Sequence, residues 1–162
     1  MLSPEIELAF GDGDYLFALP LPQLVELEEK CGFIDAQGNR RKRGVIAIYS
    51  DLLAGLVVID GEVVALPHEG RASGADSREI VRLGLIGGGK GLVNGKSIPV
   101  DALLARKLVE RHIDTAPLVK RWTTAAAILR AAIEGYEPPK KAQPAKEPAA
   151  KRARKPRSTS EA

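Results

Sequence analysis

The chain has 162 residues, with 24 lysine and arginine residues against 21 aspartate and glutamate residues and a formal net charge of +3. This length fits one domain followed by a tail. One cysteine and two histidines exclude an internal disulfide and a cysteine-cluster metal site, and they argue against zinc or histidine-dependent catalysis. We therefore expect no cofactor, no metal ion and no enzyme activity.

The apolar segments of the chain are short. None approaches the ~20 uninterrupted apolar residues of a membrane span. Residues 1–5 lack the basic region and apolar core of a signal peptide, so we expect a cytoplasmic protein without membrane contact. Only 4% of the residues are aromatic, so the core must consist of leucine, isoleucine, valine and alanine.

The positive charge lies at the C-terminal end. Residues 137–162 hold eight basic and three acidic residues, a balance of +5. Of the 24 basic and 21 acidic residues in the chain, residues 1–136 keep 16 and 18, a balance of −2. The segment 137–162 is rich in proline, alanine, lysine and arginine, which predicts a disordered basic tail after a domain over residues 1–136. Such a tail either binds nucleic acid weakly through phosphate charge or serves only as a solubilising end.

The N-terminal part predicts a β-hairpin followed by a helix. Residues 5–10 alternate polar and apolar side chains, and residues 15–19 can pair with them across a glycine-rich turn. Residues 23–30 follow as a helix with Leu24, Val25 and Leu27 on one side. Cys31 is expected to be a small buried side chain, with a reactive thiol as the alternative.

The next segments predict a basic loop, a second helix and a second hairpin. Residues 37–44 contain four successive cations, Arg40 to Arg43, which are typical of a solvated surface or, alternatively, of a nucleic-acid contact. Residues 45–54 predict a helix closed by Gly55, with an apolar face of Ile46, Tyr49, Leu52 and Leu53. Segments 56–59 and 62–66 flank Asp60-Gly61, a strong hairpin signal, and His68 in the following loop is expected to be exposed.

A helix that runs into three glycines lies at the centre of the chain. Ser73 and Asp76 have the spacing of a capping box, and Ile80, Leu83 and Ile86 fall on one apolar face. We expect Gly84 to let another backbone pack closely against the helix. The charged residues Arg78, Glu79 and Arg82 are expected to point away from the apolar face. Glycines 87–89 are expected to supply positive φ angles that end the helix. Gly84 to Lys90 also resembles a phosphate-binding loop, but Gly91 replaces the required Ser or Thr.

The last part of the domain predicts a loop and two helices. Residues 91–99 are expected to form a loop. Residues 100–113 follow as a helix that buries Val100, Leu103, Leu104, Leu108 and Val109. Pro117 opens a final helix to about Glu134, closed by Gly135. Trp122 in this helix is either a core residue or an interface anchor. Together these elements predict an α+β fold with two hairpins and about five helices around an aliphatic core.

The order of these features resembles the small tail-assembly proteins of siphovirus-like phages, prophages and gene transfer agents, which are described as tail-assembly chaperones and also as tail tube proteins. The resemblance rests on segments 19–28, 48–55, 105–109, 117–118 and 127–135, and on a central motif. That motif consists of Arg82, Leu83, Gly84, Leu85, Ile86, Gly87, Gly88 and Gly89. The hairpin at 56–66, the loop at 91–99 and the long basic tail depart from the usual pattern.

The resemblance implies a non-enzymatic chaperone that coats the helical tape-measure protein, and contacts other tail components, in the bacterial host cell during tail morphogenesis. Two alternatives stay open: a structural tail tube or connector component, and a nucleic-acid-binding accessory protein with a basic tail. Self-association is considered as well. Candidate partner-binding residues lie on the two apolar helix faces, with the domain's own core as the competing interpretation for them. They are Ile80, Leu83, Ile86, Leu118, Trp122 and Leu129.

Overall fold

The computed structural model describes residues 2–65 and 72–138, and these form an α+β fold, as the sequence predicts. His68 and residues 139–162 of the tail lie outside the described residues. The helices are α1 Leu21–Lys30, α2 Val45–Ala54, α3 Gly74–Gly88, α4 Ala102–His112 and α5 Leu118–Glu134. The strands are β1 Glu5–Phe10, β2 Gly13–Ala18, β3 Phe33–Ile34, β4 Arg40–Arg41, β5 Leu56–Ile59, β6 Glu62–Ala65, β7 Lys90–Val93 and β8 Lys96–Pro99.

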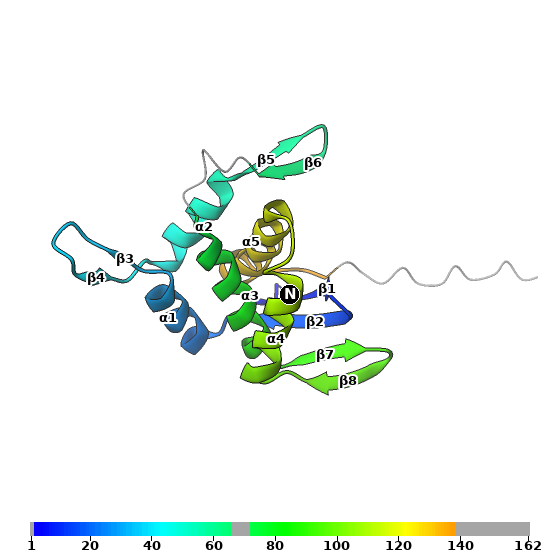
Figure 1. The fold of residues 1–162 in the computed structure, drawn as a ribbon. Coiled ribbons are helices and arrows are strands. Elements are labelled where there is room, and N and C mark those ends of the chain that lie inside the picture. The colour runs from blue at the N-terminus through cyan, green and yellow to red at the C-terminus, as the bar shows by residue number, and fades with distance from the viewer. Residues whose placement is uncertain (1, 66–71, 139–162) are drawn as a thin grey trace, which may run out of the picture.

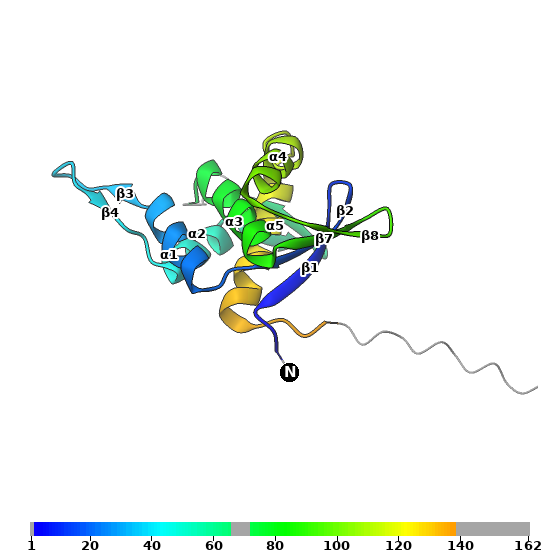
Figure 2. The same ribbon diagram turned by 90° about the horizontal axis from the view of Figure 1, so that it is seen from below.

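A four-stranded antiparallel sheet in the order β1-β2-β7-β8 forms one end of the molecule (Figures 1 and 2). The predicted N-terminal hairpin is present, and its register places Ile6 opposite Phe17. The prediction of a loop over residues 91–99 is wrong, because β7 and β8 form a second hairpin that extends the sheet. Asn94 and Gly95 both have positive φ, the requirement of a type I′ hairpin turn. Gly91 interrupts the strand pattern because it lies against the ring of Tyr15.

Helix α3 runs through the centre of the fold and packs against α1, α4, α5 and strand β2 (Figure 1). Its buried face includes Ile80, Val81 and Leu83. The capping box is complete: the Asp76 amide donates to Ser73 Oγ at 3.3 Å, and the Ser73 amide donates to Asp76 Oδ2 at 2.9 Å. Both hydrogen bonds satisfy amides that the first helical turn leaves free, so the helix begins at a defined residue.

The glycines at the end of α3 do two different things. Only Gly89 has a positive φ, of 69°, and it ends the helix in the left-handed conformation. Gly87 and Gly88 are helical, contrary to the prediction of positive φ, and a Cβ on either would overlap the backbone carbonyl of Ala18 or Leu16 in β2. These two glycines therefore let the helix backbone lie directly against the strand backbone.

The predicted faces of three helices need correction. In α2 the buried residues are Ile48 and Leu52, whereas Ile46 is 61% exposed and Leu53 is also exposed. In α4, Leu103 is 61% exposed and Ala105 is buried instead. Val25 of α1 is exposed, and Leu27 alone is fully buried. Apolar side chains therefore remain on the surface of each of these helices, because spacing alone does not show which face meets the neighbouring elements.

The hairpins β3-β4 and β5-β6 project from the helical body in different directions (Figure 1). The β5-β6 hairpin at Asp60-Gly61 is confirmed. Residues 37–44 were predicted as a loop, but Arg40 and Arg41 within them form β4, which pairs with β3, and each of these strands has only two residues. Helix α5 and its end at Gly135 match the prediction.

Candidate functional site

The six residues predicted to bind a partner lie in or against the core. Ile80, Leu83, Trp122 and Leu129 are buried, and Ile86 and Leu118 are partly buried side chains packed against the same cluster. Trp122 packs over Gly55, where a Cβ would overlap its ring. Their partner-binding role stays a prediction, and in this structure the domain itself covers them.

The central motif holds α3 to its neighbours. Arg82 was expected to point away, but its guanidinium forms ion pairs with Glu79 at 2.6 Å and with Glu26 of α1 at 3.0 Å. Gly84 packs against the side chains of Phe17 and Ile128, where we expected a backbone. The motif is therefore continuous with the core and leaves no open loop for a phosphate group.

A buried ion pair links Arg43, the last of the four successive cations, to α3. Arg43 was expected on a solvated surface, yet its Nη2 lies 2.6 Å from Asp76 Oδ2, and the Asp76 side chain is 2% exposed. Asp76 also belongs to the capping box, so one carboxylate satisfies a helix terminus and a guanidinium together. Cys31 is buried as predicted, and burial, followed by the Asp76 carboxylate, raises the pKa of its thiol to about 12.

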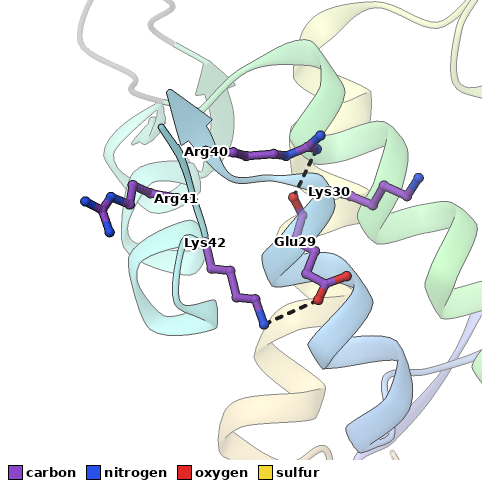
Figure 3. Close-up of a pocket in the computed structure, with 5 residues that line it drawn as sticks. All are labelled: Glu29, Lys30, Arg40, Arg41 and Lys42. Atoms are coloured by element: carbon purple, nitrogen blue, oxygen red, sulfur yellow. Dashed lines mark hydrogen bonds and ion pairs between the residues drawn. The ribbon is translucent and has the colours of Figure 1, made fainter. Parts of the chain in front are cut away.

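We define the basic arm as residues 33–42, which contain the β3-β4 hairpin. Its first strand exposes two large apolar side chains, Phe33 at 52% and Ile34 at 73%. A pocket of about 410 Å³ lies between this arm and the end of α1. It is lined by Glu29 and Lys30 of α1 and by three successive cations of the arm, Arg40, Arg41 and Lys42. Figure 3 shows Arg40 and Lys42 directed toward Glu29, with Arg41 on the far side of the strand.

An apolar groove lies where α2, α5, the β5-β6 hairpin and the chain after α5 meet. Its volume is about 650 Å³. The lining residues are mostly apolar: Ile6, Tyr49, Leu53, Leu56, Val63, Thr123, Ala126, Ala127, Arg130, Ala131, Gly135, Tyr136 and Glu137. Leu53 and Val63 are both exposed on its walls. The groove is therefore a concave apolar surface that suits the apolar face of a helix or strand from another protein.

We define the acidic face as the side of the four-stranded sheet that carries Glu5, Glu7 and Asp14. Strand alternation puts Ile6 and Phe17 on the opposite, buried side. All three carboxylates are exposed, and Leu92 of β7, opposite Asp14 in the register, is exposed on the same face. Lys90, two residues before Leu92 on the same strand, is exposed on this side as well, so the face carries three carboxylates and one ammonium group. None of the three forms an ion pair with another described residue.

No group of three or more His, Cys, Asp or Glu side chains in residues 2–65 and 72–138 is arranged to hold a metal ion. Across the same residues, no helix has the length and apolar character needed to span a membrane.

The comparison with protein families follows the same stretch of chain as the fold. A family model with the description phage tail tube protein, GTA-gp10, matches residues 3–135, which include every helix and strand given above. The chain belongs to this family. The description of the tail tube family agrees with the structural alternative better than with the chaperone interpretation. Neither the curated proteins nor the solved structures gave a match.

Proposed function

We propose that the chain is a structural subunit of a phage or gene transfer agent tail, as part of the tube or its connector. The description of its family supports this role. Its surface supports it as well, because the projecting hairpins expose apolar side chains, Phe33 and Ile34 on one and Ile59 and Val63 on another. A hairpin of two short strands is marginally stable alone, and exposed apolar groups of this kind are covered when copies assemble.

Quantitative mass spectrometry of purified particles tests the structural role. We expect the chain at a constant ratio to the other tail proteins in every fraction of a density gradient. The ratio should survive repeated washing in low-salt buffer, because a built-in subunit stays with the particle whereas a loosely adhering protein is removed. A chain that is present in producing cells but absent from intact particles contradicts this proposal.

The apolar groove favours a second candidate, a chaperone that holds the tape-measure protein during assembly. A tape-measure protein is long and mostly helical, and an amphipathic helix can lay its apolar face in a groove of this kind. The groove lies on the surface, whereas Ile80, Leu83, Trp122 and Leu129 are covered. For this function we therefore propose Leu53 and Val63 as the contact residues.

Co-expression with the tape-measure protein of the same gene cluster tests this candidate. The wild-type chain should make that partner soluble, and the double substitution Leu53→Asp and Val63→Asp should abolish the effect. Leu103→Asp is the matched control, because Leu103 is exposed on α4 and does not line the groove. Equal solubility with all variants, or an insoluble partner with the wild type, would reject the groove as the tape-measure site.

The basic tail carries a third interpretation that is tested separately. Weak nucleic-acid binding through residues 137–162 stays a prediction. Deleting these residues should remove all salt-dependent DNA binding. Binding that persists after the deletion would assign it to residues 1–136.

A further inference from the structure

We propose that copies of this chain associate head to tail, with the basic arm of one copy docked on the acidic face of the next. This inference rests on the proposed structural function, and it names the two surfaces that would join neighbouring subunits. Arm and face carry opposite charge, and each exposes apolar side chains next to the charges. The occupant that fits the acidic face is therefore a second copy of the chain.

The basic arm has the chemistry of an interaction element. Arg41 pairs within the arm with Asp35 at 2.7 Å, so it fixes the hairpin. Lys42 reaches Glu29 at 3.3 Å with both side chains largely exposed, and such surface pairs are weak and exchange readily. Among the described residues, Arg40 donates only to the backbone carbonyl of Glu29, at 3.4 Å. Two cations are thus available to a partner carboxylate beside the exposed ring of Phe33.

The acidic face has the complementary chemistry. Glu5 and Glu7 lie on β1, which is the edge strand of the sheet. Asp14 lies on the neighbouring strand and faces the same side. These carboxylates repel one another on a surface that also exposes Leu92, so cations with adjoining apolar groups would both neutralise and cover it.

The positions of the two surfaces decide the type of assembly. In both views the β3-β4 hairpin of the basic arm projects on one side of the helices, and strands β2, β7 and β8 of the sheet lie on the other side, with β1 nearer the centre (Figures 1 and 2). The arm therefore cannot reach the acidic face of its own chain. A contact between two different surfaces is heterologous, and its repetition closes into a ring or continues as a filament. Both outcomes suit a subunit of a tubular tail.

Charge reversal on each surface tests the contact by sedimentation velocity of the full chain. At about 50 mM salt the wild type should associate, and at about 500 mM it should dissociate, because screening shortens the range of the attraction. Arg40→Glu with Lys42→Glu should weaken self-association at least about tenfold, and so should Glu5→Lys with Glu7→Lys, since like charges then meet. A mixture of these two variants should associate again, because every arm then meets a face of opposite charge.

The control variant carries Lys107→Glu with Lys120→Glu, the same change in net charge at exposed positions on α4 and α5, and it should sediment like the wild type. A wild-type monomer at both salt concentrations overturns the proposal, as does a mixture that stays dissociated. Unchanged sedimentation with loss of double-stranded DNA binding in the arm variant overturns it in favour of a phosphate contact. If particles contain the chain while the variants assemble normally, this inference fails and the structural function stands. Absence from particles rejects the function itself.

Discussion

Single residues at the junction of α3 and β2 set how closely a helix can approach a strand. Gly88 lies where any Cβ would overlap the carbonyl of Leu16, and a backbone atom cannot rotate away as a side chain can. Gly74, in the first turn of the same helix, has no atom within 4 Å of the position of a Cβ. The two glycines are therefore a matched pair, with the same residue type in the same helix.

We predict that Gly88→Ala lowers the free energy of unfolding by about 1–3 kcal/mol, as overpacking does. Gly74→Ala should change it by less than about 1 kcal/mol and in the stabilising direction, because it lowers only the entropy of the unfolded chain. Urea denaturation of both variants measures the difference. Equal midpoints would show that α3 does not press on β2 at Gly88.

The buried thiol gives a prediction about pH. The pKa of Cys31 is raised from its ordinary 9.0 to about 12 by burial and then by the Asp76 carboxylate. A raised folded-state pKa means that the neutral thiol stabilises the fold fully below pH 9.0 and that this contribution is lost as the pH rises toward about 12. The wild type should lose stability across this range, and Cys31→Ala should lose less. Identical pH profiles for the two chains would contradict this assignment.

Among the helices, the start of α3 shows how one side chain can stabilise two elements at once. Asp76 caps its own helix and also accepts a hydrogen bond at 2.6 Å from Arg43, which belongs to the segment before α2. Removing Asp76 leaves a largely buried guanidinium without its closest carboxylate. Replacing Asp76 should therefore lower the stability of the fold by more than the loss of one helix N-cap does.

We predict that Asp76→Ala costs about 3 kcal/mol of stability, the scale of a broken buried ion pair. Ser73→Ala should cost about 1 kcal/mol, the scale of one N-cap. Asp101→Ala is the control, because Asp101 caps α4 by accepting from the Leu104 amide at 2.8 Å and takes no part in the ion pair. If all three variants have the same stability, Arg43 contributes nothing through Asp76.

The sequence predicts an element where local chemistry defines it. The hairpin at Asp60-Gly61 and the caps at Ser73 and Gly135 depend on residues adjacent in the chain, and each is present. Contacts between distant residues were not predictable. The Glu28 carboxylate of α1 accepts the first amide of α2 from Val45, and no local motif indicates such a bond.

The candidate site follows the same division. The motif from Arg82 to Gly89 is visible in the sequence, but burial decides its role, and its residues Leu83 and Leu85 belong to the core. The exposed ring of Phe33 and the apolar groove became visible only once the hairpins were placed in space. An apolar side chain in a short strand looks the same in the sequence whether it is covered or exposed.

At the scale of the whole molecule, the hairpin of the basic arm and the greater part of the sheet that carries the acidic face lie on opposite sides of the helices (Figure 1). A molecule with two complementary ends is suited to repeat itself along a ring or a tube. The proposed structural function requires such repetition, and the description of the chain's family agrees with it.

Carbodiimide cross-linking inside purified particles tests this account most directly. This reagent joins a lysine to a carboxylate only when the two are in contact. We predict a cross-linked peptide that connects Lys42 of the basic arm to Glu5 or Glu7 of the acidic face, and the same peptide should be missing from the free monomer treated in the same way. Particles that lack the chain, or that contain it without this peptide, would contradict the account.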